Sequence, residues 1–252
     1  MTVNPLISVI MPAYNAEKYI EDAVKSVICQ TYTNWELIII NDCSSDGTLQ
    51  IAQRLAQADT RITVTDNAEN IGVAKTRNKG LDAASGDWVA LLDSDDIWHR
   101  DKLKKQLETA YSTGADIVYC SYKMIGEKND DVIKDYIVPH STTFDELKKV
   151  NVIGCSTVML SKEIASQYSF TTDFYHEDLV YWLDVLKKGY KAAGVTEVLA
   201  KYRVAKGSRA SNKLKSAYNR WHIYRSHLKM SLPQSICCII QYAFAGIKKY
   251  SR

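Results

Sequence analysis

Hydrophobic and polar positions follow two alternating periods along the first hundred residues of the chain. Short runs rich in Ile, Val and Leu are each followed by a longer segment with helical periodicity. The run from Leu37 to Ile40 contains no polar residue, as is typical of a strand covered on both faces of a parallel sheet. The predicted strands span residues 6–11, 35–41, 62–65 and 87–92, and the predicted helices span 17–30, 46–58 and 73–84. This order predicts an α/β fold with a mostly parallel central sheet flanked by helices.

The pattern becomes less regular after residue 115. Strand-like runs are expected at 117–122, 156–160 and 192–203, and helices near 145–150 and over 177–188. The end of the chain predicts two further helices, at 211–229 and 232–250, with a break at Pro233. We therefore expect one domain over 1–210, whose halves meet near residue 100, followed by a helical basic C-terminal tail over 211–252.

Charge is divided unequally along the chain. Residues 198–252 contain 12 of the 32 Lys and Arg residues and none of the 29 Asp and Glu residues, so this part carries about +12 and the rest about −9. A basic tail indicates an anionic partner, either nucleic acid or a lipid surface. The nearly apolar stretch 236–247 would span roughly 18 Å as a helix, short of the ~30 Å hydrocarbon core, so it would lie on a membrane rather than cross it. The alternative is that this helix packs on the protein's own core.

The composition is that of an ordinary globular protein. With 252 residues, 46% of them hydrophobic, the chain is long enough to bury a full core. Its six cysteines show no CxxC spacing, which suits a reducing compartment, argues against a structural zinc site and predicts mostly buried thiols. The first apolar run is too short for a secretory signal. We therefore expect the protein in the cytoplasm.

Three aspartates follow directly after the apolar run 88–92, where a buried strand is expected to reach the surface. Side chains two positions apart on an extended segment point the same way, so Asp93 and Asp95 can converge on one cation while Asp96 turns aside. Carboxylates combined with water and diphosphate oxygens are the usual ligands of Mg²⁺ or Mn²⁺ at phosphate-handling sites. The alternative is an acidic cap for a helix predicted at 97–111. Three carboxylates exceed what a cap requires, which favours the metal site.

Other polar residues follow the earlier predicted strands. Tyr14, in a turn after the first strand, is suited to stack on a flat base. Asp42 ends the second strand and has no capping role, whereas Asp46 is expected to cap the next helix. Arg77 lies on a helix beside the sheet, where it would meet phosphate or base. Because ligands bind at the carboxyl ends of parallel strands, these side chains and the aspartate cluster are expected to share one rim.

Four segments in this order resemble the family 2 inverting glycosyltransferases of GT-A fold. They are SVIMPAYN at 8–15, NDCSSDGT at 41–48, NIGVAKTRNKG at 70–80 and the DXD-type segment DSDD at 93–96. The resemblance implies a nucleotide-sugar-binding half within residues 1–100, to which Pro12 and Ser94 also belong. It implies Tyr14 against uracil, Asp42 on the base, Arg77 near the nucleotide, Asp93 towards the ribose and Asp95 on the metal.

The resemblance extends into residues 101–210, the half that is expected to bind the acceptor. His176-Glu177-Asp178-Leu179 looks like the family's Glu-Asp pair, whose aspartate, here Asp178, is the general base. Residues 202–208 are similar to the segment after the acceptor region, although Ala205 stands where many relatives have histidine. The candidate diphosphate contacts there are Arg203, Lys206 and Arg209.

These assignments predict an inverting transfer of a hexose. The metal on Asp95 would take up negative charge on the leaving diphosphate, and Asp178 would accept the proton of the acceptor hydroxyl on the opposite face of the sugar. An α-linked donor then gives a β-linkage. One alternative is a metal-dependent α/β nucleotidyltransferase, for which the sequence lacks the expected Gly-rich phosphate loop. The other is a non-enzymatic module that binds anionic surfaces through the tail.

The substrates are expected from the resemblance and the tail together. The resemblance is strongest to bacterial enzymes that extend polyprenyl-diphosphate-linked sugars during O-antigen or capsule assembly. It implies a UDP-sugar donor, glucose or galactose, and a GlcNAc or GalNAc acceptor on undecaprenyl diphosphate. A lipid-linked acceptor and a basic tail together predict a peripheral position on the inner face of the bacterial cell membrane. The acidic body and the absence of a recognisable motif argue against nucleic acid as the partner.

Overall fold

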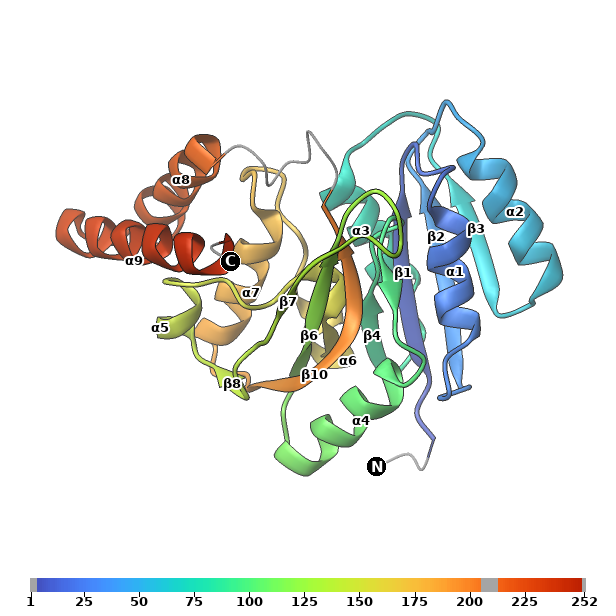
Figure 1. The fold of residues 1–252 in the computed structure, drawn as a ribbon, viewed down its shortest axis with the longest axis horizontal. Helices are drawn as coiled ribbons and strands as arrows, with labels where there is room; N and C mark the ends of the chain where they lie inside the picture. Colours follow the sequence, from blue (N-terminus) through green and yellow to red (C-terminus); the bar gives the residue numbers. More distant parts are fainter. Residues whose placement is uncertain (1–3, 205–212, 251–252) are drawn as a thin grey trace.

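A mixed sheet of ten strands forms the centre of the protein, here a computed structural model that describes residues 4–204 and 213–250. Eight strands follow one another in the order β3-β2-β1-β4-β9-β6-β10-β5, while β7 pairs with β6 and β8 pairs with β10. Helices cover both faces of this sheet (Figure 1). The predicted α/β fold is therefore confirmed.

The first half consists of four parallel strands and the helices that connect them. Its elements are β1 (Ile7–Ala13), α1 (Ile20–Ile28), β2 (Trp35–Asn41), α2 (Thr48–Ala58), β3 (Ile62–Asp66), α3 (Val73–Ala83) and β4 (Trp88–Leu91). β1 is completely buried and pairs in parallel with β2 on one side and β4 on the other. Helices α1 and α2 pack on one face of the sheet and α3 on the other, because alternate residues of β1 enter separate hydrophobic cores. The carboxyl ends of these strands lie at one edge.

The second half adds strands of both directions. Its elements are β5 (Ile97–Trp98), α4 (Lys102–Thr113), β6 (Ile117–Ile125), β7 (Val132–Tyr136), β8 (Ser141–Thr142), α5 (Phe144–Leu147), the 3₁₀ turn η1 (Cys155–Thr157), β9 (Met159–Ser161), α6 (Lys162–Gln167), α7 (Glu177–Lys187) and β10 (Ala192–Arg203). β9 lies antiparallel between β4 and β6 and so joins the two halves. β6 and β10 are parallel neighbours. The single domain predicted over 1–210 thus shares one continuous sheet in its described part.

The helix predicted at 97–111 is wrong at its start. Ile97 and Trp98 form β5, which pairs antiparallel with β10, and the helix begins only at Lys102. Asp96 caps no helix: its buried carboxylate accepts a hydrogen bond from the backbone N–H of Arg203 at 2.7 Å. This long-range bond places the segment after the aspartate cluster on the sheet.

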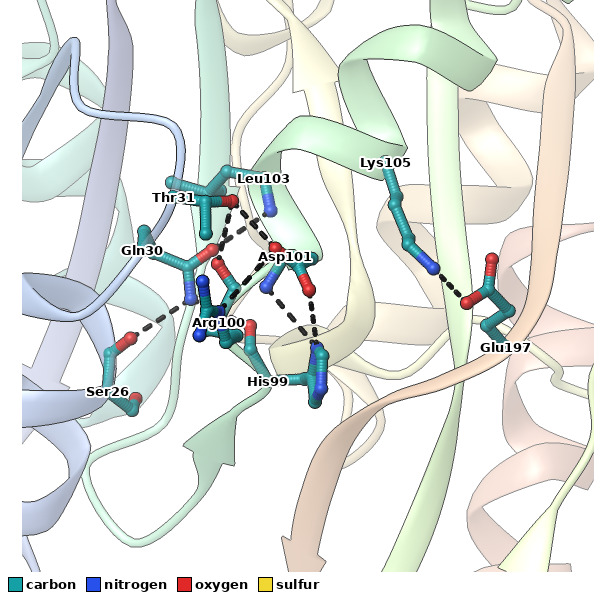
Figure 2. A network of polar contacts seen from close by, with 9 residues as sticks. All are labelled: Ser26, Gln30, Thr31, His99, Arg100, Asp101, Leu103, Lys105 and Glu197. Carbon is teal, nitrogen blue, oxygen red and sulfur yellow. Dashed lines mark hydrogen bonds and ion pairs between the residues drawn. The ribbon is translucent and has the colours of Figure 1, made fainter.

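A second set of contacts fixes the beginning of α4 (Figure 2). Gln30 accepts a hydrogen bond from the backbone N–H of Leu103 at 3.1 Å and donates to the carbonyl of His99 at 2.8 Å. Thr31 donates to Asp101 at 2.9 Å. Since Gln30 follows α1, these bonds connect the end of one helix to the start of another. They hold the chain in place directly after the aspartate cluster.

The tail is helical, as predicted. Its elements are α8 (Lys213–His222), a π-helical turn η3 (Ile223–His227) and α9 (Leu232–Tyr250), with Pro233 in the first turn of α9. Both helices lie at the end of the molecule opposite β3 (Figure 1). Ile223, Tyr224 and Cys238 are buried, so part of the tail does pack on the protein. None of the helices within residues 4–204 and 213–250 is long and apolar enough to cross a membrane.

The cysteines differ from the prediction of mostly buried thiols. Cys120, Cys155 and Cys238 are buried, but Cys29, Cys43 and Cys237 are exposed, and all six are free. The sequence did not separate these two groups, because cysteine suits either a core or a surface helix.

Candidate active site

A cleft of about 760 Å³ opens where the carboxyl ends of β1, β2 and β4 face the beginning of α7. This volume is within the usual range for a small-molecule site. The predicted site residues that fall in the described part of the chain all line it: Pro12, Tyr14, Asp42, Arg77, Asp93, Ser94, Asp95, Asp178 and Arg203. Lys206 and Arg209 lie outside the described residues. The rim predicted from the parallel strands is therefore a single cavity in the structure.

Tyr14 is presented to solvent by a turn with left-handed backbone. Its side chain is 53% exposed, and the next residue, Asn15, has a φ of 48°. The Asn15 side chain accepts from the N–H of Ser45 at 2.9 Å, and the Asn15 N–H donates to Ser44 at 3.0 Å. The turns after β1 and β2 thus fix each other. An exposed aromatic ring on a fixed turn suits stacking against a base.

Asp42 is buried and organises a neighbouring loop. Its two carboxylate oxygens accept from the backbone N–H groups of Ile71 and Gly72, each at 2.9 Å. The Asn67 amide donates to the same carboxylate at 2.9 Å. Gly72 has a φ of +83°, which favours glycine, and immediately precedes α3. The predicted contact of Asp42 with a base is untested, but the side chain already positions the loop beside it.

Arg77 bridges the two sides of the cleft. Its buried guanidinium donates to Asp93 at 2.7 Å and to Glu177 at 3.0 Å. Asp93 follows β4, whereas Glu177 begins α7, one hundred residues further along the chain from Arg77. We expected Arg77 at the nucleotide, and it does line the cleft, but two of its nitrogens are occupied by carboxylates of the protein. This pairing connects the aspartate cluster to the residue next to Asp178.

The aspartates of the cluster have separate environments. Asp93 binds Arg77, and its N–H donates to Ser156 at 3.0 Å. Burial, together with the neighbouring charge of Asp93, raises the pKa of Asp95 to about 6. Asp96 is fully buried and faces away from the cleft, towards the backbone of β10. The prediction that Asp96 turns aside is confirmed, while its role as a helix cap is wrong.

Asp95 fits a hydrated divalent cation shared with a substrate. Within residues 4–204 and 213–250, no group of three or more His, Cys, Asp and Glu side chains forms a metal cage. A single carboxylate is nevertheless sufficient for Mg²⁺ or Mn²⁺ when water and phosphate oxygens complete the coordination. The raised pKa of Asp95 indicates a carboxylate whose charge is poorly compensated by the protein. A cation there would supply the missing positive charge.

Arg203 holds the backbone of the aspartate cluster in place. Its guanidinium donates to the carbonyl oxygens of Asp95, Gly126 and Glu127 at 2.8, 3.0 and 2.8 Å, and to the Asn129 side chain at 2.6 Å. We expected Arg203 to contact a diphosphate. That contact stays a prediction, since all three guanidinium nitrogens already donate to the protein.

Asp178 lies in the first turn of α7 and lines the same cleft as Tyr14. Burial raises the pKa of this carboxyl, while the positive charge of Arg77 acts in the opposite direction. A raised pKa makes the ionised carboxylate a stronger base. Its neighbour Glu177 is held by Arg77, so the direction of this turn is fixed. The geometry therefore suits a positioned general base.

Aromatic residues from the second half of the chain were not predicted from the sequence. Tyr122, Tyr175 and Tyr202 also line the cleft, and the rings of Tyr122 and Tyr202 are 5.7 Å apart. These two lie near the carboxyl ends of β6 and β10, which are parallel neighbours. The rule that located the aspartates, namely the carboxyl end of a parallel strand, would have found them if the pairing of β6 with β10 had been known.

The class of the protein follows from this fold and site together with a family comparison. Residues 8–168 match the model of glycosyl transferase family 2, and the chain belongs to this family. It is 42% identical to the putative teichuronic acid biosynthesis glycosyltransferase TuaG of Bacillus subtilis, over 97% of both chains. It is 36% identical to WfgD of Escherichia coli, named UDP-Glc:alpha-D-GlcNAc-diphosphoundecaprenol beta-1,3-glucosyltransferase, over 98% of this chain and 95% of that relative.

Solved structures of similar shape agree with the fold. Residues 1–349 of Staphylococcus aureus TarS in complex with UDP-GlcNAc match with a TM-score of 0.74 at 19% identity, over 96% of this chain and 72% of that one. The mannosyltransferase PcManGT of Pyrobaculum calidifontis, in complex with GDP-Man and Mn²⁺, matches with a TM-score of 0.72 over 100% and 77%. The GT-A fold is thus confirmed. Family membership favours glycosyl transfer over nucleotidyl transfer and over a non-enzymatic binding module.

Proposed function

We propose that the protein transfers a hexose from a UDP-sugar to a GlcNAc- or GalNAc-diphospho-undecaprenol acceptor. The product is β-linked and serves O-antigen or capsular polysaccharide assembly. The observation that carries this proposal is that Tyr14, Asp93, Asp95 and Asp178 all line one cleft. The name of WfgD supports glucose as the hexose and GlcNAc as the acceptor sugar. Galactose and GalNAc are the second choices.

The nucleotide is assigned to the first half of the chain. Tyr14 stacks on the uracil, beside Pro12, and Asp42 lies at the base. Asp93 and Ser94 face the ribose. Asp95 would hold Mn²⁺ or Mg²⁺, whose chemistry is to stabilise negative charge on the leaving diphosphate. Further diphosphate contacts are assigned to Arg203, Lys206 and Arg209.

Asp178 performs the proton transfer. Its carboxylate accepts the proton of the attacking acceptor hydroxyl, the hydroxyl oxygen bonds to the anomeric carbon, and the bond to the diphosphate oxygen breaks. Attack from the side opposite the diphosphate inverts the configuration, so an α-linked donor gives a β-linked product. Asp178 lines the same cleft as Asp93 and Asp95, which supports its assignment as the base.

A lipid-linked acceptor requires work at a membrane. We assign the protein to the cytoplasm and to the inner face of the bacterial cell membrane, in peripheral contact through the C-terminal tail. Nucleic acid is not a partner in this proposal.

Product analysis tests the proposal. The purified full chain is incubated with Mn²⁺ or Mg²⁺, a panel of UDP-sugars and synthetic GlcNAc- and GalNAc-diphospho-lipids. The masses of the products are then measured by mass spectrometry. We expect the mass of one hexose to be added from UDP-glucose or UDP-galactose, and about 10³-fold slower addition with Asp178→Asn. Transfer from neither hexose donor to either acceptor would contradict the proposal.

A further inference from the structure

The outward face of α9 is apolar. Leu232, Ile236, Ile240 and Phe244 recur every fourth residue and are 54%, 45%, 49% and 69% exposed. A spacing of four places them in one stripe along the helix. Pro233 and Cys237, also exposed, border the stripe. We call these four residues the α9 stripe. An exposed apolar stripe of this size indicates a surface that is covered when the protein works.

The opposite face of α9 contacts the protein through smaller and more polar groups. Ser235 and Cys238 are buried there, and the ring of Tyr242 lies 4.2 Å from the guanidinium of Arg220 on α8. The helix is therefore oriented with its larger aliphatic and aromatic side chains towards solvent. A helix that only packed on its own core would have the reverse orientation.

The charged side chains of the tail itself are all positive. Arg225 and Lys229 are exposed on the segment that leads into α9, and the sequence places Lys248 and Lys249 near its other end. The chain has no Asp or Glu after Glu197. Two copies of the chain would bring like charges together across the stripe, whereas an anionic lipid surface would complement them.

The tail is connected to the acceptor side of the cleft. The Lys215 ammonium of α8 lies 4.7 Å from the centre of the Tyr175 ring, and the Phe174 ring lies 5.4 Å from His222 and 5.5 Å from His227. These aromatic residues directly precede the first turn of α7. The tail therefore contacts the residues just before the turn that carries Asp178.

We propose that the α9 stripe inserts into the headgroup region of an anionic bilayer and that the cations beside it bind the lipid phosphates. Phe174 and Tyr175, held by α8, then connect the membrane-bound helix to the wall that receives the acceptor. This inference deepens the proposed function and rests on it for the lipid-linked acceptor. The partner surface is an anionic bilayer, and α9 lies along it without crossing it.

Vesicle binding tests the surface independently of catalysis. The full chain is sedimented with vesicles of phosphatidylglycerol and phosphatidylcholine, or of phosphatidylcholine alone. We expect Ile240→Asp/Phe244→Asp to lower the partition coefficient on anionic vesicles at least tenfold. The matched control is Ile133→Asp/Ile137→Asp, whose wild-type side chains are 56% and 57% exposed outside the tail. It should remain within twofold of wild type, and Arg225→Glu/Lys229→Glu should lower binding severalfold.

Equal loss in the control pair, or unchanged binding of Ile240→Asp/Phe244→Asp, would overturn the inference. So would a dimer, measured by analytical ultracentrifugation, that dissociates in this variant while wild type does not bind vesicles. A soluble short-chain GlcNAc-diphospho acceptor separates the two proposals. Hexose transfer to it without vesicle binding refutes only the membrane surface, and vesicle binding without hexose transfer refutes only the proposed function.

Discussion

The two walls of the cleft are built in different ways. On the wall that we assign to the donor, the carboxylates are held by the protein itself: Asp42 by two backbone N–H groups and Asp93 by Arg77. The wall that we assign to the acceptor contains Tyr122, Tyr175 and Tyr202 together with Asp178, whose pKa is raised by burial. One wall presents carboxylates that are already held by hydrogen bonds, and the other combines aromatic rings with the acidic pair Glu177 and Asp178.

This difference indicates a division of work. A preorganised polar wall suits a ligand of constant shape, such as a nucleoside diphosphate, because its groups need no rearrangement on binding. An aromatic wall suits the apolar faces of sugar rings and tolerates variation. Arg77 belongs to both walls, since it binds Asp93 on one and Glu177 on the other. Variants of Asp178, Asp95 and Arg77 separate the roles of the two walls.

Replacing the base should have the largest effect. Asp178→Asn removes the proton acceptor, and kcat should fall about 10³- to 10⁴-fold, the upper range for general-base catalysis. The KM for the UDP-sugar should change by no more than about threefold, because the donor wall is intact. Steady-state kinetics with both substrates measures the two parameters.

The pH profile of wild type provides the control for that variant. A base must be deprotonated to act, and burial raises the pKa of Asp178 above its ordinary value of 3.8. The kcat should therefore fall as the pH falls through this raised pKa, and Asp178→Asn should lack this acid limb. An identical acid limb in both proteins would assign it to another group.

Removal of the proposed metal ligand should have the next largest effect. Asp95→Ala should lower kcat about 10²- to 10³-fold, since charge on the leaving diphosphate would be poorly stabilised. Calorimetric titration of UDP should also lose its dependence on Mn²⁺ or Mg²⁺. Ser94→Ala is the neighbouring control, with full metal dependence expected. Unchanged metal-dependent turnover of Asp95→Ala would remove the assignment.

Removing the Arg77 ion pairs to Asp93 and Glu177 should lower kcat by an intermediate amount. Arg77→Gln leaves the carboxylates of Asp93 and Glu177 without their cation, and kcat should fall about 10- to 10²-fold through misplacement of Asp178. Because Arg77 lowers the pKa of Asp178, its loss should also move the acid limb of kcat to higher pH. The free energy of unfolding should fall by about 3 kcal/mol or more.

Arg77→Lys distinguishes the contribution of the guanidinium geometry from that of its positive charge. Lysine keeps the positive charge but has no planar fork with which to bind two carboxylates. The acid limb should therefore return towards its wild-type pH while kcat remains low. Recovery of both would show that charge alone is required.

The smallest effect on activity is expected from replacing Lys102, which does not line the cleft. Lys102 is fully buried, donates to Gln106 at 2.6 Å, and burial lowers its pKa from 10.5 to about 8. The unfolded chain then binds more protons than the folded one between about pH 8 and 10.5, so this group makes stability rise with pH in that window. Relative to Lys102→Met, the unfolding free energy of wild type should rise by about 3 kcal/mol across it. Denaturant unfolding at several pH values measures this difference, with turnover changed no more than about threefold.

Elements determined by local pattern were predicted well. The strands β2 and β10 have the predicted bounds, because apolar runs and polar ends identify a buried strand without knowledge of its neighbours. The segment after Asp96 was predicted wrongly as a helix. Its strand conformation depends on pairing with β10, about one hundred residues away, which no local pattern contains.

In the site, too, contacts between residues far apart in the sequence could not be predicted. Its residues could be gathered on one rim because parallel strands end at one edge, and they do line one cleft. The partners of those residues could not be predicted. Asp42 binds the loop at Gly72, thirty residues away, and Arg77 binds Glu177, one hundred residues away. Such pairs depend on tertiary packing, so the sequence identified the residues but not which of their atoms are already bound.

The configuration of the new glycosidic bond tests the central claim most directly. The product formed from UDP-α-glucose and a GlcNAc-diphospho-lipid can be isolated and its anomeric coupling measured by NMR. In-line attack assisted by Asp178, with no covalent intermediate, predicts a β-linked product that the Asp178→Asn variant forms at least about 10³-fold more slowly than wild type. An α-linked product, or equal formation of the β-linked product by that variant, would contradict the account.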